Sequence, residues 1–256
     1  MKCDEVALAG ESIVSSLVAN WDYARHFDPP SFHNRRPFVD DANQVVDRAR
    51  VDKHEFFKIA LEDPEALKLW VSQECIVTGP FSQFLLLLGS QIENVHLRGA
   101  FMEVASGEHN GLKDGIAAHS HPWLLHRLSV SVGLVSDQIQ PLPFTISFLR
   151  TLASQLGNVM TGLGAIGVGN ERLLISEYSA VKECFQASLP SADYRAFLMA
   201  NIAEDTGHAS IMEELALQIA LDESDERNYV CGAEVGVEAR LKYYDELVEY
   251  HQAHAR

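Results

Sequence analysis

The chain has 256 residues, of which 47% are hydrophobic and 22% are charged, and its formal net charge is −16. This length is enough for one large domain with a sizeable buried core, and the composition is typical of a globular protein. The acidic balance, without any basic run, argues against a nucleic-acid partner and against an anionic membrane surface. No apolar run approaches the roughly 18 residues that a membrane span needs.

The four cysteines, Cys3, Cys75, Cys184 and Cys231, include no close pair. A Cys-x-x-Cys site is therefore absent, and a disulfide framework is not expected in a chain of this length. The first residues do not resemble a secretory signal peptide. We expect a cytoplasmic protein.

Helical periodicity dominates the first half of the chain. Ile13, Leu17 and Trp21 recur at intervals of four residues and predict a first amphipathic helix, which ends before the Asp28-Pro29-Pro30 break. We expect an irregular segment from there to about Asp40. Further helices are predicted near residues 45–46, 56–61 and 64–78, followed by one long helix over 81–106. Residues 107–115 hold three glycines and are expected to form a loop.

The second half of the chain is also helical by its periodicity. A helix is predicted to begin near His121-Pro122 and to end at Gly133. The remaining helices are predicted over residues 145–155, 159–187, 192–221 and 227–254. No convincing alternating pattern indicates a strand. The sequence therefore predicts an all-α fold of about eight helices, in a single domain over residues 1–256.

The segment from Asn201 to His208 carries the most informative polar pattern. Asp205 and His208 are three residues apart, and Asn201 lies one turn before Asp205, so all three share one helix face. A carboxylate and an imidazole at this spacing can bind one cation. A lone Asp-x-x-His pair is more often a solvated surface pair, so the segment needs support from elsewhere.

Other candidate ligands lie earlier in the chain. Glu171 interrupts a small and apolar helical stretch, where a carboxylate is costly unless a cation or hydrogen bonds compensate. A polar face shared with its neighbours explains it about as well. His121 stands at a predicted helix start, where a structural role is the more common one. Glu103 and Glu108 lie near the end of the preceding helix, and each is either a carboxylate ligand or an exposed side chain.

The spacing Gly162-x-Gly164-x-x-Gly167 matches the dinucleotide-binding fingerprint. That fingerprint functions only in a turn between a strand and a helix. Here it lies inside a helical stretch. Small residues that let helices pack closely explain it better. No local signature supports a cysteine nucleophile either.

Three blocks together resemble one known family: His121-Pro-Trp-Leu-Leu, Gly169-Asn-Glu171-Arg, and the helix with Asn201, Asp205 and His208. They are similar to the haem-oxygenase-like di-iron oxidases and oxygenases, whose fold is shared by thiaminase-like and pyrroloquinoline-quinone-synthase-like proteins. The resemblance covers residues 52–250, the haem-oxygenase-like core, and leaves residues 1–50 as an N-terminal extension of unassigned role. It implies a haem-oxygenase-like helical bundle and a homodimer.

The resemblance also implies a metal-ligand set. The family binds two irons through a Glu and a His, a Glu from a middle helix, and a His-x3-Asp-x2-His helix. The matching positions in this chain are Glu103 or Glu108, His121, Glu171, Asn201, Asp205 and His208. Of the two candidates for the first Glu, Glu103 is slightly favoured. Asn201 stands where the family has histidine, and an amide is a poor iron ligand, so one metal site is expected to be weakened or absent.

The activity implied by the resemblance is that of a non-haem di-iron oxidoreductase. It would use two Fe(II) ions and O2 to oxidise a small amino-acid-like or fatty-acid-like carboxylate in a biosynthetic pathway. N-oxygenation, desaturation and oxidative carbon–carbon cleavage are the outcomes known in the family, and an external electron donor is a further partner. The alternatives are a metal-free thiaminase-like or cofactorless enzyme of the same fold, which Asn201 favours, and a non-catalytic helical binding protein.

Overall fold

A computed structural model of the chain describes residues 22–29, 37–110 and 119–254. Every regular element in these residues is helical, which confirms the predicted all-α class. The elements are α2 (Tyr23–Phe27), α3 (Pro37–Ala49), η1 (Val51–Lys53), α4 (Glu55–Glu62), α5 (Pro64–Thr78), α6 (Phe81–Gly89), α7 (Val95–Asn110), α8 (His121–Ser131), η3 (Ser136–Gln138), α9 (Pro143–Gln155), α10 (Val159–Leu163), η4 (Gly164–Arg172), α11 (Leu173–Ser188), α12 (Arg195–Ile219) and α13 (Glu223–His254).

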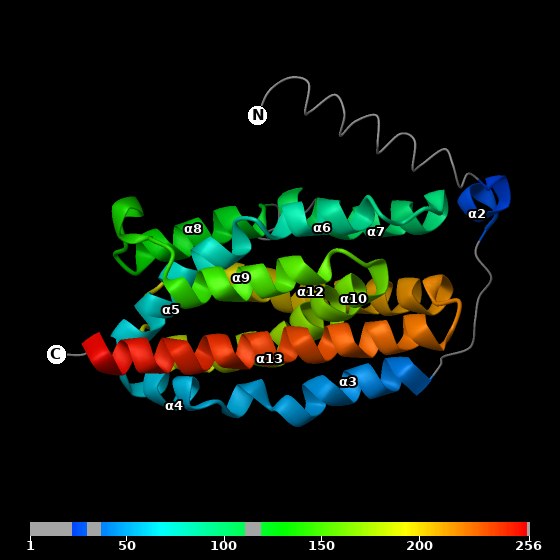
Figure 1. The fold of residues 1–256 in the computed structure, drawn as a ribbon. Coiled ribbons are helices and arrows are strands. Elements are labelled where there is room, and N and C mark those ends of the chain that lie inside the picture. The colour runs from blue at the N-terminus through cyan, green and yellow to red at the C-terminus, as the bar shows by residue number, and fades with distance from the viewer. Residues whose placement is uncertain (1–21, 30–36, 111–118, 255–256) are drawn as a thin grey trace, which may run out of the picture.

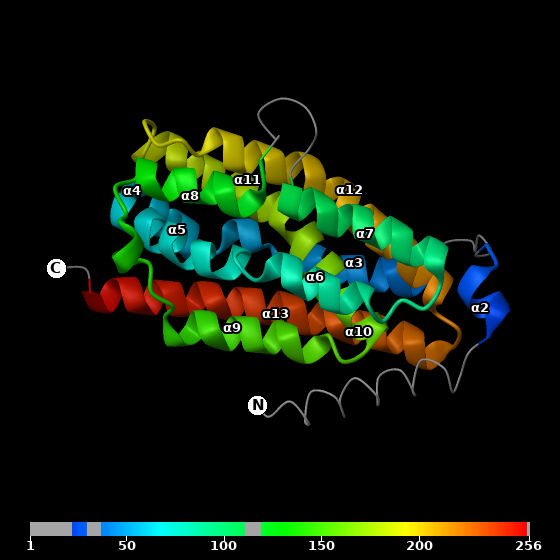
Figure 2. The same ribbon diagram turned by 90° about the horizontal axis from the view of Figure 1, so that it is seen from above.

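The helices form an elongated bundle in tiers. In Figure 1, α13 runs along the lower part of the bundle beside α3 and α4, and α6, α7 and α8 form the upper tier. The view from above in Figure 2 places α11 and α12 along one side and α9 and α13 along the other. The helix α13 packs against α3, α9, α10 and η4, while α12 packs against α7, α8, α11 and η4. The segment η4 therefore lies between the two longest helices.

Helix boundaries follow local signals that the sequence contains. The Asp63 side chain accepts a hydrogen bond from the backbone N–H of Glu65, and Pro64 occupies the first turn of α5, as its sequence predicts. The Asn158 side chain caps α10 in the same way, by accepting from Met160 and Thr161. Such caps satisfy backbone donors that a helix start leaves free.

The glycines of the fingerprint-like stretch serve helix packing. A Cβ atom on Gly164 would lie 2.0 Å from the backbone oxygen of Tyr229, and one on Gly232 would lie 2.2 Å from the backbone oxygen of Thr161. Both contacts are between α13 and the α10–η4 stretch. Because the stretch is continuous helix and contains no strand-to-helix turn, the close-packing interpretation of these glycines is confirmed.

Three predicted boundaries are wrong. The single helix over 81–106 is two helices, because the Asn94 side chain caps a new helix by accepting from His96 and Leu97. The segment that was expected to be irregular as far as Asp40 already becomes helical at Pro37, a residue suited to a first turn. The predicted loop over 107–115 begins too early, since α7 continues through residue 110. The first predicted helix, over residues 13–21, lies outside the described residues.

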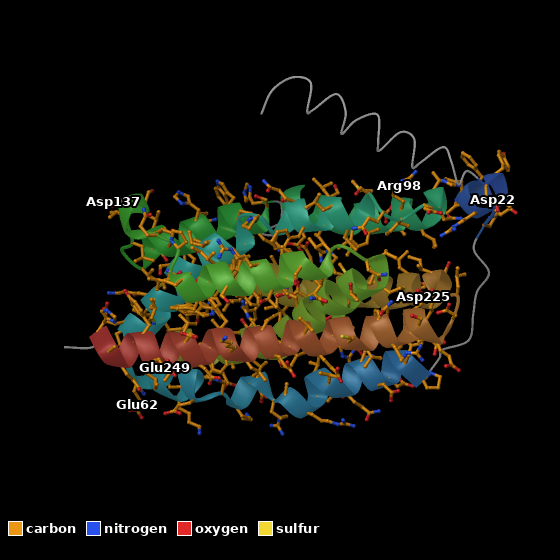
Figure 3. All side chains as sticks on the ribbon, viewed as in Figure 1. Asp22, Glu62, Arg98, Asp137, Asp225 and Glu249 are labelled. Atoms are coloured by element: carbon orange, nitrogen blue, oxygen red, sulfur yellow. The ribbon has the colours of Figure 1, made fainter. Side chains whose placement is uncertain are left out.

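Charged side chains lie mainly at the periphery of the bundle. Figure 3 labels six of them on different elements, namely Asp22, Glu62, Arg98, Asp137, Asp225 and Glu249. Large apolar and aromatic side chains such as Trp70 and Tyr244 fill the interior, and the indole N–H of Trp70 donates to the Tyr244 hydroxyl at 3.0 Å. Among the described residues, each helix is too short or too polar to cross a membrane.

One buried ion pair joins three helices at the centre of the bundle. Arg240 of α13 donates through Nε to Glu177 Oε2 of α11 at 2.8 Å and lies 3.0 Å from Glu74 Oε1 of α5. All three side chains are at most 1% exposed. Burial of one charge is costly, and here the opposite charge lies in the same place. Burial raises the pKa of Glu74, against the attraction of Arg240.

Candidate metal centre

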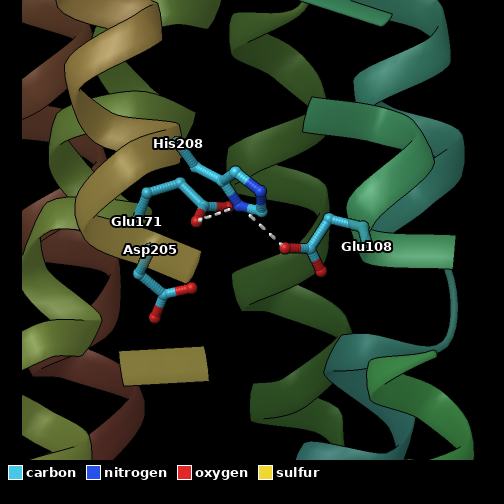
Figure 4. A group of neighbouring side chains, drawn as sticks. All are labelled: Glu108, Glu171, Asp205 and His208. Atoms are coloured by element: carbon cyan, nitrogen blue, oxygen red, sulfur yellow. Dashed lines mark ion pairs between the residues drawn. The ribbon is translucent and has the colours of Figure 1, made fainter. Parts of the chain in front are cut away.

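Four buried side chains from three segments converge at one point. They are Glu108 of α7, Glu171 of η4, and Asp205 and His208 of α12. Each offers one ligand atom, and these atoms all lie within 4.8 Å of one another. Figure 4 shows His208 between the carboxylates of Glu108 and Glu171, with Asp205 below them on the same helix as His208.

The local structure explains why these side chains point inward. Asp205 and His208 are separated by three residues on α12, so they project from one face. Glu171 lies in η4, which is π-helical, and such wider turns occur frequently at functional sites. Glu108 lies in the last turn of α7. His121 is the first residue of α8.

Glu108 connects the two histidines. Its Oε2 lies 2.7 Å from Nδ1 of His121, and its Oε1 lies 3.1 Å from Nδ1 of His208. Nδ1 of His208 is also 3.5 Å from Oε2 of Glu171. The carboxylate of Glu108 therefore links α7 to both α8 and α12 inside the bundle.

The contact between Glu108 and His121 shifts the pKa values of both groups strongly. Burial alone would raise the pKa of Glu108, but the charge of His121 and its hydrogen bond lower it to about 2. Burial opposes the charged form of His121 as well, yet the carboxylates of Glu108 and Glu204 raise its pKa to about 10. In the absence of another cation, this pair is ionised at neutral pH.

The pKa values of the remaining groups are raised, for reasons that differ between the carboxylates and His208. Burial raises the pKa of Asp205 well above its usual range, and the charges of Glu171 and Glu108 add to the effect. Burial also raises the pKa of Glu171. His208 resembles His121, because contact with Glu108 and Glu171 overcomes its burial and raises its pKa to about 10. These raised pKa values reflect the burial and the crowding of carboxylates at one point.

The donor set fits a divalent cation. Asp205 Oδ2 and Glu204 Oε1 are buried without a hydrogen-bond partner. Four further buried atoms make ion-pair contacts of 3.1–3.5 Å but no hydrogen bond, and they are Glu171 Oε2, Glu204 Oε2, His121 Nε2 and His208 Nδ1. Buried polar atoms are nearly always paired, so a group of such atoms at one point indicates a ligand. Mixed carboxylate and imidazole donors suit iron or manganese better than metals that prefer thiolates.

The structure brings His121, Glu171, Asp205 and His208 together, along with Glu108. Glu103 is exposed and does not join them, so the structure favours Glu108 over Glu103, against the slight preference from the sequence. The physical reason is that α7 continues past residue 107 and carries Glu108 into the bundle. Glu103, five residues earlier, is rotated by about 140° around the same helix.

Asn201 is buried in the vicinity of the cluster. Its Nδ2 donates to the backbone oxygen of Phe197, four residues earlier on α12, at 2.8 Å. Asn201 also lines the cavity that reaches Asp205 and Glu171. The amide is thus present at the expected place, with its N–H directed back to its own helix.

Glu204 is the residue that the sequence interpretation missed. It is 5% exposed, and its Oε2 lies 3.5 Å from Nε2 of His121. It lies three residues after Asn201 and four before His208, so helical periodicity alone places it on the face of the other candidates. The signal was present in the sequence, although the family pattern has no ligand at this position.

A small cavity is lined by residues of both the cluster and the buried ion pair. Its lining includes Glu171, Asp205, Glu74, Arg240 and Tyr178. Nη1 of Arg240 is buried and has no hydrogen-bond partner. A donor of this kind can bind a carboxylate.

Comparison with known proteins gives evidence for the fold. No protein-family model matches the chain, and no curated protein matches it either. Among solved structures, a CADD-like protein of unknown function from Nostoc punctiforme is 16% identical with a TM-score of 0.71, and the match covers 84% of this chain and 96% of that one. A domain of unknown function with a haem-oxygenase-like fold from Shewanella denitrificans is 14% identical with a TM-score of 0.70, over 87% and 95% of the two chains.

A third solved structure shares the same arrangement of helices. It is a TenA homologue from Pseudomonas syringae, 9% identical with a TM-score of 0.65, and the match covers 83% of this chain and 91% of that one. Identities this low relate the folds and not the activities. The chain has the haem-oxygenase-like fold.

Proposed function

We propose that the chain is an iron-dependent oxidase or oxygenase that acts on a small amino-acid-like or fatty-acid-like carboxylate. The observation that carries this proposal is the buried group of Glu108, Glu171, Asp205 and His208, with ligand atoms within 4.8 Å of one another. So many carboxylates in a core are costly unless a cation compensates them. The resemblance of the sequence blocks to di-iron oxidases points to the same residues.

The chain's own groups have distinct roles in this proposal. Glu108, Glu171, Asp205 and His208 hold the metal, with His121 kept in place by its 2.7 Å contact with Glu108. Bound iron would supply the one-electron chemistry through which O2 oxidises an organic substrate. The surrounding apolar helices exclude bulk water from the centre, which limits the loss of oxidising equivalents to solvent.

The cavity beside the cluster has a volume of about 20 Å³, which is room for one water molecule, so a substrate would enter it only with movement of the surrounding side chains. We propose that Arg240, whose Nη1 has no hydrogen-bond partner and which also lines this cavity, would then bind the substrate carboxylate. The salt bridge to Glu177 fixes the guanidinium, so the carboxylate would be held in one orientation. The outcome of oxidation would then depend on which substrate atom faces the metal. Net oxygenation or desaturation also needs reducing electrons, for which we propose an external donor.

Anaerobic titration with Fe(II) tests the proposal, followed by exposure to O2 with a panel of amino acids and fatty acids. We expect stoichiometric binding, and O2 consumption above the autoxidation of free iron. Glu108→Gln should lose metal, whereas Glu103→Gln, an exposed change on the same helix, should bind as the unmodified chain does. Equal binding by both variants, or no metal uptake by the unmodified chain, would refute the assignment.

A metal-free enzyme of the same fold is the second candidate. Asn201 favours it, because the amide replaces an expected imidazole ligand, and one structural neighbour is a TenA homologue. This candidate predicts substrate turnover that neither added iron nor a chelator changes. The anaerobic Fe(II) titration therefore distinguishes the two candidates, because only the iron-dependent enzyme is expected to bind the metal stoichiometrically.

A further inference from the structure

Glu204 lies outside the four-residue cluster, yet its carboxylate is buried without hydrogen bonds. It is 5% exposed, and neither of its carboxylate oxygens has a hydrogen-bond partner. A buried carboxylate without hydrogen bonds is rare, and it needs a compensating group. The nearest such group is the imidazole of His121, whose Nε2 lies 3.5 Å from Oε2 of Glu204.

The two ring nitrogens of His121 face two different carboxylates. Its Nδ1 is 2.7 Å from Glu108, while its Nε2 faces Glu204 and has no hydrogen-bond partner. In metal sites, a histidine commonly donates from one ring nitrogen to a carboxylate and binds the ion through the other. The pair of His121 contacts has this arrangement, with Glu108 as the orienting carboxylate and the Glu204 side open.

The distance between the open atoms suits a shared ion. Two ligand atoms that each lie roughly 2.1 Å from one ion are separated by about 3.0–3.5 Å at angles near 90–113°. The 3.5 Å between His121 Nε2 and Glu204 Oε2 falls at the upper end of this range. No movement of α8 relative to α12 is needed for both atoms to contact one cation.

Gly107 leaves space beside the side chains of Glu204 and His208. A Cβ on Gly107 would lie 3.4 Å from Glu204 Oε2 and 3.2 Å from His208 Nε2. The last turn of α7 therefore approaches both side chains closely without covering them. Glu204 and His208 are four residues apart on α12, so both are directed towards the same side of α7.

The charge balance also favours a further cation. Glu108, Glu171, Glu204 and Asp205 place four carboxylates around two imidazoles in a buried region. Even with both imidazoles protonated, two negative charges remain in excess unless carboxylates are protonated. One divalent ion at the four-residue cluster would not contact Glu204, which is not part of that group and whose charged neighbour is His121.

We propose that Glu204 and His121 bind a second divalent cation beside the one held by Glu108, Glu171, Asp205 and His208. Glu204 thereby supplies a ligand that Asn201 does not, from a position three residues further along α12. This inference rests on the proposed metal centre, and it assigns to Glu204 a role that the resemblance does not imply. The ligand class is a hard or borderline divalent ion such as Mn(II) or Fe(II).

The test uses Mn(II), which needs no exclusion of oxygen, with the full chain freed of metal by chelation. Bound metal per chain is measured by equilibrium dialysis and elemental analysis. The unmodified chain should bind two equivalents, Glu204→Gln one, and Glu103→Gln two. Glutamine has nearly the same shape as glutamate and removes one of several crowded buried carboxylates, so Glu204→Gln is expected to fold, as checked by circular dichroism.

Glu204→Asp serves as a second variant that keeps the charge and shortens the side chain. We expect it to retain two equivalents, with the affinity for the second lowered at least tenfold. Two tightly bound equivalents in Glu204→Gln, or one equivalent in the unmodified chain, would overturn the inference while leaving the metal centre in place. No Mn(II) or Fe(II) bound by the unmodified chain would overturn the proposed function, and the inference with it.

Discussion

Two glycines of α7 allow a matched test of the metal centre. Gly99 and Gly107 lie in the same helix, and adding a methyl group changes their surroundings in different ways. A Cβ on Gly99 meets nothing within 4 Å, whereas one on Gly107 lies 3.2 Å from Nε2 of His208. Gly107→Ala therefore presses on a proposed ligand, and Gly99→Ala leaves it untouched.

The expected effect of Gly99→Ala is a gain in stability. Alanine in a helix interior is more stable than glycine by about 0.5–1 kcal/mol. For a chain of this size, each kcal/mol corresponds to about 2–4 °C in the melting temperature. The melting temperature of the metal-free protein should therefore rise by about 1–4 °C. In Gly107→Ala, the displacement of the His208 ring offsets this gain.

The difference should be larger when metal is present. Disturbing the surroundings of a metal ligand typically lowers metal affinity by about 10- to 100-fold. At a fixed excess of metal, this lowers the stabilisation of Gly107→Ala by about 1.4–2.8 kcal/mol. The rise in melting temperature caused by Mn(II) should then be smaller than in Gly99→Ala by about 3–11 °C.

Differential scanning calorimetry measures both quantities in one series. Each variant is melted after chelation and again with the same excess of Mn(II). A metal-dependent rise that is equal in Gly107→Ala and Gly99→Ala would show that the cation does not lie against His208. A large loss of stability in metal-free Gly107→Ala would instead show that the ring cannot yield, which would refute the magnitude argued above.

Three further predictions concern the fold around the site. Gly164→Ala should lower the free energy of unfolding by about 3 kcal/mol or more, because its Cβ would lie 2.0 Å from a backbone oxygen. Urea unfolding measures this loss, and Gly157→Ala, whose Cβ would meet nothing within 4 Å, is the control. Glu177→Gln should lower the free energy of unfolding by about 3 kcal/mol in the same assay, since it removes a charged partner of the buried Arg240. No loss would mean that Glu74 alone compensates the arginine. At pH 8 a thiol reagent should label the exposed Cys231 and spare the buried Cys184, because burial raises the pKa of the Cys184 thiol to about 12. Mass spectrometry identifies the labelled cysteine, and early labelling of Cys184 would contradict its burial.

The all-α class and most of the members of the candidate site could be predicted from the sequence. The shared face of Asp205 and His208 could be predicted because a spacing of three residues fixes it once the helix is recognised. Glu171 was recognisable because a carboxylate in an apolar stretch is unusual, whatever the detailed helix geometry. Such signals are local, and tertiary structure confirms that the three side chains meet.

The choice between Glu103 and Glu108 could not be made in this way. It depends on whether α7 ends before or after Gly107, and three glycines between 107 and 115 favoured an early end. In the structure, Gly107 is a packing residue, because a larger side chain there would press on Glu204 and His208. A glycine required by a neighbouring helix looks the same in the sequence as a glycine that ends a helix.

Two buried charged clusters face the same cavity, and the fold balances them differently. Arg240 supplies a permanent positive charge to Glu177 and Glu74, and its guanidinium also lies 5.0 Å from the ring centre of Tyr243. The charges of this cluster are therefore balanced largely within the chain, although Nη1 of Arg240 has no hydrogen-bond partner. The cluster around Glu108 has more carboxylates than imidazoles, and burial together with like charge raises the pKa of Asp205 within it. The charges around Arg240 are thus balanced by the chain itself, while the carboxylates around Glu108 are in excess and can take up a cation, as a metal centre requires.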